Sequence, residues 1–286
     1  MQSKQQKMKR PGLHFYHFSS GVIAFSSTRQ GGYSEASYGE WNINRYCGDN
    51  DESISWNRKA LCELLDINDD KLLMPHQVHR TEIAKIDHEF FCLTAEDRQQ
   101  RLEGVDTIMT NLQDVCIGVS TADCIPILLY DKMNHAVCAI HAGWRGTVDH
   151  IAEKSVMAMV DNYGSIPSDI IAQIGPGISL DSFEVGDEVY DNFAKAGFDM
   201  STISKRYPTK EPHDEKWHID LPVCNRQQLI AAGLKEENIS LSGICTFKHH
   251  DTFFSARRLG INSGRIYTAI LLKKSPLQHR CNIKNK

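Results

Sequence analysis

The sequence predicts an α/β protein of the mixed α+β kind, a single domain of mixed β-sheets with flanking helices. Strand-like and helix-like segments are interspersed without strict alternation, and several strands follow one another directly. No Gly/Ser/Pro-rich linker and no internal repeat divides the 286 residues. We therefore expect a disordered basic tail over 1–12, one domain over 13–275 and a second basic tail over 276–286.

Composition and charge exclude several classes of protein. The chain is 41% hydrophobic and 24% charged with a formal net charge of -4, as in ordinary globular proteins. No apolar run approaches the roughly 18–20 residues of a membrane span, and no long basic run outside the tails favours nucleic acid or an anionic membrane. Nine irregularly spaced cysteines and a poor secretory signal favour reduced thiols in the cytoplasm. The oligomeric state, monomer or homo-oligomer, stays open.

The first half of the chain shows clear element signals. Residues 22–26 predict a strand that runs into a loop over 28–32, whose paired glycines allow positive φ. A helix is expected over about 51–66, because its apolar positions share one face and Asp49 or Asn50 would cap it. Residues 81–86 alternate like a strand, and 88–103 give no clear pattern.

The second half of the chain also predicts strands interspersed with helices. Apolar, β-branched segments predict strands over 105–109, 115–119, 125–130, 135–140, 170–174, 240–244, 252–255 and 265–272. Helices are expected over 148–163, 186–196 and 222–232, each followed closely by a glycine. Thr147 would cap the first of these helices, with Gly164 ending it, and 201–218 is predicted to be a polar loop.

Three reactive side chains stand at the ends of predicted strands. Cys124 closes Thr-Ala-Asp-Cys, His141 opens His-Ala-Gly-Trp-Arg-Gly-Thr, and His79 closes His-Gln-Val-His. A buried structural thiol and capping histidines are the ordinary alternatives. One thiolate and two imidazoles can also hold zinc, leaving a fourth position for water or substrate. The spacings of 45 and 17 residues are not themselves a metal signature.

Several arginines could bind an anion. Arg145 lies between glycines that let a ligand approach the backbone, and its planar fork suits phosphate or carboxylate. Arg257 and Arg258 follow an apolar segment, although a solvated charge pair is the ordinary alternative. Arg58 lies in the middle of a predicted helix, where surface exposure is the simplest interpretation.

An ordered set of motifs resembles a known family. The sequence is similar to the YfiH or multicopper polyphenol oxidase (laccase-domain) proteins from about residue 22 to 272. The motifs that match, in order, are Thr-Arg-Gln-Gly-Gly at 28–32, Gly-Asp at 48–49, Asn-Arg at 57–58, Gln-Val-His at 77–79, Thr-Ala-Asp-Cys at 121–124, His-Ala-Gly-Trp-Arg-Gly at 141–146, Gly-Pro-Gly-Ile at 175–178, Cys-Thr at 245–246, Phe-Phe-Ser-Ala-Arg-Arg at 253–258 and Gly-Arg at 264–265.

The resemblance implies a fold, a cofactor and an activity. It implies a CNF1/YfiH-like catalytic domain with Zn²⁺ bound by His79, Cys124 and His141. It also implies a purine nucleoside phosphorylase that acts on adenosine, inosine and methylthioadenosine, with adenosine deaminase activity. The small-molecule substrates would then be a purine nucleoside and phosphate.

Further residues receive roles on the same basis. Gln77 and Asp123 join the substrate-binding candidates, with Asp123 orienting a ligand or moving a proton. The arginines 58, 145, 257 and 258 are the candidates for phosphate. Arg80, Gly177 and Ala256 depart from the usual family pattern, and Arg80 and Ala256 would alter the rim of the pocket.

Three rival functions use the same residues. A copper-binding polyphenol oxidase is disfavoured because the thirteen histidines form no His-x-His pair, although Cu²⁺ could occupy a Cys/His₂ site in vitro. A metal-free hydrolase would use Cys124 as nucleophile and His141 as base, on a peptidoglycan precursor. A binding protein without catalysis ranks third, since it would not need reactive groups at strand ends.

Overall fold

The computed structural model describes residues 9–209, 211 and 215–273. The basic tail predicted over 276–286 and most of that over 1–12 therefore lie outside the described residues.

The strands are β1 (Leu13–Tyr16), β2 (Val22–Ser27), β3 (Leu72–Leu73), β4 (Ile83–Ile86), β5 (Thr107–Thr110), β6 (Cys116–Thr121), β7 (Ile125–Asp131), β8 (Ala136–Ala142), β9 (Ile170–Ile174), β10 (Glu184–Val185), β11 (Ser204–Pro208), β12 (Glu215–Ile219), β13 (Ile239–Leu241) and β14 (Ile266–Leu272). The α-helices are α1 (Asp51–Leu65), α2 (His88–Cys92), α3 (Ala95–Arg101), α4 (Trp144–Val148), α5 (Ile151–Tyr163), α6 (Asp187–Lys195), α7 (Met200–Ile203), α8 (Leu221–Ala231) and α9 (Ala256–Leu259).

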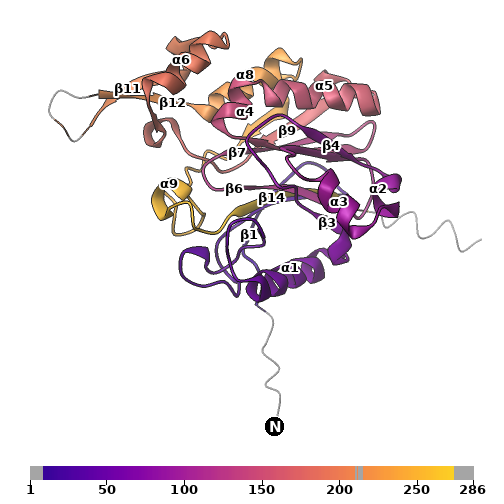
Figure 1. Cartoon of the computed structure of the whole chain (residues 1–286). Coiled ribbons are helices and arrows are strands. Elements are labelled where there is room, and N and C mark those ends of the chain that lie inside the picture. Colours follow the sequence, from indigo (N-terminus) through magenta and orange to yellow (C-terminus); the bar gives the residue numbers. More distant parts are fainter. Residues whose placement is uncertain (1–8, 210, 212–214, 274–286) are drawn as a thin grey trace, which may run out of the picture.

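Two mixed sheets form the centre of the molecule. The first sheet has the strand order β1-β2-β14-β6-β3, and the second has the order β13-β9-β7-β8-β5-β4. Most neighbours pair antiparallel, while β3–β6, β4–β5 and β13–β9 pair parallel. A small third sheet, β10-β12-β11, lies beside α6 on one side of the molecule (Figure 1). The predicted class of mixed sheets with flanking helices is confirmed.

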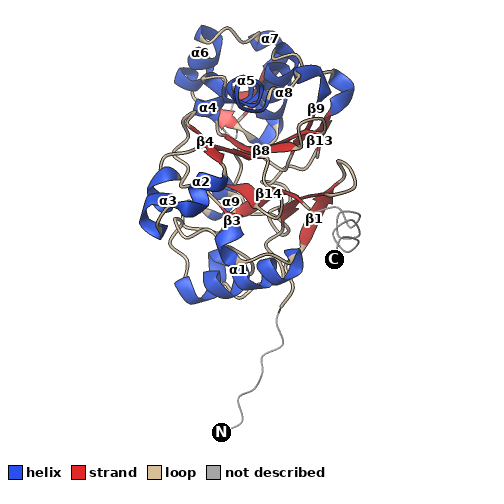
Figure 2. Ribbon diagram, turned by 90° about the vertical axis from the view of Figure 1, so that its right-hand side faces the viewer, coloured by secondary structure: helices blue, strands red, loops and turns tan. Residues whose placement is uncertain are grey.

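The molecule has four layers. The two large sheets are stacked, with α5 and α8 covering the outer face of the second sheet and α1 the outer face of the first (Figures 1 and 2). Separate apolar clusters fill the three spaces between the layers. The central strands β6, β7, β8 and β14 are thus buried on both faces, which explains why they are mostly apolar.

Alternate side chains of strand β7 pack on opposite faces of the second sheet. Ile127 and Leu129 pack into the cluster beneath α5, while Leu128 and Tyr130 pack between the two sheets. Successive side chains of a strand point to opposite faces, so one strand can contribute to two cores.

The chain passes from the first large sheet to the second twice, at one edge. It leaves β3 of the first sheet for β4 of the second, and later leaves β6 of the first for β7 of the second. His79 lies in the first crossing and Cys124 in the second. The carboxyl end of β8, which carries His141, lies beside the start of β7 because Ile125 pairs with Ala142.

Several local predictions are wrong. The region 201–218 is not a loop, since it contains α7 and the β11–β12 pair. Residues 252–255 form a turn rather than a strand, and Ser255 caps α9 through its Oγ. Thr147 does not cap a helix, because it lies inside α4 and its Oγ1 accepts a hydrogen bond from Asn225. The unassigned region 88–103 forms α2 and α3.

Other element predictions are confirmed. Asn50 caps α1 by accepting a hydrogen bond from Ser53 N, and Gly164 ends α5 in the left-handed region at φ 69°. Along the described ranges, the helices are all too short or too polar to cross a membrane.

Candidate metal centre

Three side chains converge at the edge where the chain crosses between the sheets. The ligand atoms of His79, Cys124 and His141 all lie within 4.8 Å of one another. His79 is exposed, Cys124 is partly buried and His141 is buried. No second group of three or more potential metal ligands occurs among the described residues. The trio singled out in the sequence is therefore brought together by the fold.

A sharp turn presents Cys124. The preceding Asp123 has a φ of 91°, a conformation that few residues other than glycine adopt. Its carboxylate accepts a hydrogen bond from Thr246 Oγ1 at 2.7 Å and another from Arg257 N, also at 2.7 Å. These bonds hold the turn against the segment that leads into α9. Asp123 thus anchors the backbone that carries the thiol.

A buried carboxylate stands behind the two histidines. Asp106 accepts a hydrogen bond from His141 Nδ1 at 2.7 Å. It also accepts hydrogen bonds from the backbone N–H groups of Val78, His79 and Arg80. His141 therefore donates from Nδ1, and its Nε2 is the nitrogen left to bind a metal.

The electrostatics favour a thiolate. Burial opposes ionisation of Cys124, but the charge and hydrogen bonds of His141 and His79 outweigh it and lower the pKa of the thiol to about 6. Burial also opposes protonation of His141, but the Cys124 charge and the Asp106 hydrogen bond raise the pKa of its ring to about 9. Both shifts favour a thiolate beside a protonated imidazole in the metal-free site.

His79, Cys124 and His141 line a small cavity of about 200 Å³. Gln77 lines it and is anchored to the backbone of Ser120 through both ends of its amide: Nε2 donates to the Ser120 carbonyl, and Oε1 accepts from Ser120 N. The Asn44 Nδ2 group donates to Ser120 Oγ at 2.5 Å. Arg265 also lines this cavity and adds a positive charge.

All four arginines predicted from the sequence to bind an anion lie outside this cavity. Arg145 is exposed and stacks on the Trp144 ring at 4.3 Å. Arg257 donates from its guanidinium to the Glu184 carbonyl at 3.2 Å, and Arg258 lies over an aromatic ring. None of the three lines the metal cavity, although Ala256, next to Arg257, does.

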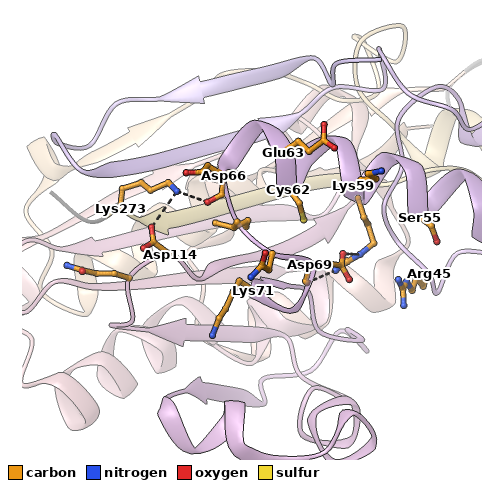
Figure 3. Close-up of a pocket in the computed structure, with 14 residues that line it drawn as sticks. Arg45, Ser55, Lys59, Cys62, Glu63, Asp66, Asp69, Lys71, Asp114 and Lys273 are labelled. Atoms are coloured by element: carbon orange, nitrogen blue, oxygen red, sulfur yellow. Dashed lines mark hydrogen bonds and ion pairs between the residues drawn. The ribbon is translucent and has the colours of Figure 1, made fainter. Parts of the chain in front are cut away.

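Arg58 makes buried hydrogen bonds within the protein, away from the metal cavity. It is buried on α1, where Nε donates to Asp69 Oδ1 at 2.8 Å and a terminal nitrogen donates to the Leu72 carbonyl. It lines a different cavity, shown in Figure 3 with Lys59, Cys62 and Asp69 among its labelled walls. The expectation of surface exposure is therefore wrong, since the guanidinium joins α1 to Asp69 and to the start of β3. Phosphate binding by Arg58 stays a prediction.

Three residues near the site were not predicted from the sequence. Asp106 was not among the candidates, although a carboxylate inside the strand predicted over 105–109 was a visible signal. Ser120 and Asn44 had no local signal at all, because only the tertiary fold brings them together.

Comparisons with known proteins identify relatives that match nearly the whole chain. The family model "Multi-copper polyphenol oxidoreductase laccase" matches residues 23–273. The chain is 44% identical to a purine nucleoside phosphorylase of Bacteroides thetaiotaomicron over 255 residues, covering 89% of this chain and 93% of the relative. It is 43% identical to adenosine deaminase RL5 of an unknown prokaryotic organism, covering 91% of this chain and 98% of the relative.

Solved structures share the fold. The crystal structure of YfiH from Bacillus licheniformis superposes with a TM-score of 0.81 at 27% identity, covering 93% of this chain and 100% of the other. The crystal structure of YlmD from Geobacillus stearothermophilus superposes with a TM-score of 0.78 at 30% identity, covering 89% of this chain and 93% of the other. Because the family model matches most of its length, the chain belongs to the multicopper polyphenol oxidoreductase laccase family. Its relatives include proteins named YfiH and YlmD.

Proposed function

We propose that this protein is a zinc-dependent purine nucleoside phosphorylase that acts on adenosine, inosine and methylthioadenosine and also deaminates adenosine. The observation that carries the proposal is the convergence of His79, Cys124 and His141 on one polar cavity. Relatives that bear the names purine nucleoside phosphorylase and adenosine deaminase, both above 40% identical, support it.

The donor set fits zinc. One soft thiolate and two imidazoles are ligands that zinc accepts in open sites, where a fourth position remains for water or substrate. The lowered pKa of Cys124 supplies the thiolate without a large cost for removing its proton. When bound, zinc would act as a Lewis acid that polarises an oxygen of water or substrate.

The residues around the ligands provide binding and orientation. Phosphorolysis breaks the bond between the base and C1′ of the ribose and forms a bond from C1′ to a phosphate oxygen. The phosphate needs a nearby cation, and Arg265 lines the cavity. Arg145, which follows His141 at the start of α4, remains a second candidate. Gln77, fixed by the Ser120 backbone, presents a rigid wall to the ribose.

The test pairs metal content with product analysis. Protein purified without added metal is assayed for bound metals by mass spectrometry and incubated with adenosine, with and without phosphate. We expect about one zinc per chain, adenine release only with phosphate, and inosine in both samples. Cys124→Ala should lose the metal and both products, whereas Cys92→Ala, at an exposed thiol on α2, should keep them. A zinc-loaded protein inert towards nucleosides would refute the activity.

A thiol hydrolase is the second candidate, favoured by the lowered pKa of Cys124 beside His141. Iodoacetamide distinguishes the two functions. A thiolate that binds metal resists alkylation until the metal is chelated, whereas a free catalytic thiolate reacts at once in protein as purified. A protein that contains no metal as purified, and whose Cys124 is labelled at once without a chelator, would favour the hydrolase.

A further inference from the structure

Asp106 is a fully buried acid directly before β5. Its side chain has no exposed surface, and the residue also bonds through its backbone: the carbonyl accepts from His141 N at 2.8 Å, and its N–H donates to the Glu82 carbonyl. A buried carboxylate is costly unless its acceptor positions are filled. Here they are filled by groups that belong to the metal site.

Four N–H donors meet this one carboxylate. Oδ1 accepts from His141 Nδ1 at 2.7 Å and from His79 N at 3.0 Å, while Oδ2 accepts from Arg80 N at 2.8 Å and Val78 N at 3.3 Å. A carboxylate offers about four lone-pair positions and no donor, so it matches this set. An asparagine would turn an NH₂ group towards N–H donors on one side.

The contacts with the 78–80 segment hold a strained backbone. His79 has a φ of 63°, in the left-handed region that residues with a side chain rarely adopt. Three consecutive N–H groups directed at one charge stabilise that turn. Since the turn sets the direction of the His79 ring, the carboxylate acts on this ligand through its backbone.

The contact with His141 selects a tautomer. With Nδ1–H donating to Asp106, the neutral ring carries its lone pair on Nε2, on the side away from the carboxylate. The two rings lie edge to face with centroids 4.8 Å apart. One side chain therefore connects a ligand on the β3–β4 crossing with a ligand on β8.

We propose that Asp106 is the positioning residue of the metal centre, which fixes the tautomer of His141 and the backbone of His79 at once. This inference rests on the metal site of the proposed function but not on the reaction that the site performs. Asp106 does not touch the metal position itself. Its role is to arrange two ligands before a metal arrives.

The test compares Asp106→Asn with Asp131→Asn. Asp131 is a matched control, because it is equally buried, also accepts backbone N–H bonds, and lies at the end of β7 opposite Cys124. Zinc affinity is measured with a competing chelator, and Co²⁺ spectra report the thiolate and the ligand geometry. We expect Asp106→Asn to weaken zinc binding about 10–100-fold and to alter the Co²⁺ spectrum, whereas Asp131→Asn changes neither. Equal affinities for wild type and Asp106→Asn would overturn the proposal.

A second measurement needs no variant. Nitrogen-15 NMR of the wild-type histidine rings, recorded with and without zinc, identifies the protonated nitrogen of His141. The proposal requires a proton on Nδ1 in both samples and a metal-induced shift of Nε2. Loss of the proton from Nδ1 in the zinc-bound sample would refute it. Because neither readout uses a nucleoside, failure of the proposed activity and failure of this role are distinguishable.

Discussion

Gly143 lies directly behind two of the metal ligands. A Cβ at this position would approach His79 Cδ2 to 2.8 Å and Cys124 Sγ to 3.2 Å. The glycine in the His-Ala-Gly motif is therefore explained by close approach of side chains, and not by its backbone, since its φ of −71° suits any residue. Without a Cβ at this position, the side chains of His79 and Cys124 can come close to the Gly143 backbone.

Gly143→Ala should separate the ligands while the fold persists. We expect zinc affinity to fall on the order of tenfold, because a displaced ligand is held in the wrong geometry. Gly186→Ala is the matched control: Gly186 is likewise the residue before a helix, with φ −79°, but a Cβ there meets nothing within 4 Å. The affinities are compared by chelator competition. Equal affinity in the two variants would contradict this account of Gly143.

The Cys124 thiol should show its ionisation in metal-free protein. Because the folded environment lowers its pKa from 9.0 to about 6, the thiolate forms as the pH rises through about 6. The alkylation rate should therefore be half-maximal near pH 6, and zinc should suppress it. The pKa values of buried Cys116 and Cys138 are raised by burial, so these thiols should stay unlabelled in the folded protein.

Peptide mass spectrometry assigns the labelled thiol at each pH. Cys124→Ser removes the signal and identifies it. A midpoint near 9 would show that the histidines do not stabilise the thiolate.

At the scale of elements, two connections and the end of one strand make the site. Two crossings between the large sheets deliver His79 and Cys124, and the end of β8 delivers His141. Connections carry few packing constraints of their own, so side-chain hydrogen bonds must fix them. Asp106 fixes the first crossing and Asp123 fixes the second.

Helix α1 is tied to the first sheet by Arg58, away from the metal centre. Arg58→Met should lower the free energy of unfolding by about 1–3 kcal/mol, because it removes charge-assisted bonds to Asp69 and to the Leu72 carbonyl. It should leave the KM for phosphate unchanged. Denaturant unfolding and steady-state kinetics check the two parts. A large rise in the KM for phosphate would restore the role first expected for this residue.

At the scale of the whole molecule, a metal would cross-link the two sheets. Its ligands come from both crossings and from β8, so only the folded chain brings them within 4.8 Å. Binding that is specific to the folded state raises stability, by about 2.7 kcal/mol when free metal is 100 times Kd.

Zinc should therefore raise the thermal midpoint of metal-free protein. At roughly 2–4 °C per kcal/mol for a domain of this size, the expected shift is about 5–10 °C. Differential scanning fluorimetry with and without a chelator measures it. Cys124→Ala should lose the shift, and an equal shift in that variant would place the stabilising metal elsewhere.

The sequence determined the elements that depend on local pattern. The apolar runs that became β7, β8 and β14 were recognisable because burial on both faces requires them. The cap at Asn50 and the end of α5 at Gly164 follow from local chemistry. The residues of the metal trio were also recognisable, through reactive side chains at strand ends and through the ordered family motifs.

Only the tertiary structure decided how those residues meet. The trio is separated by 45 and 17 residues, and its convergence depends on stacking two sheets whose connections cross at one edge. The same stacking buries Asp106 behind the histidines and carries Arg58 to a different cavity. The physical reason is that local pattern reports which face of an element is buried, whereas long-range packing decides which buried groups become neighbours.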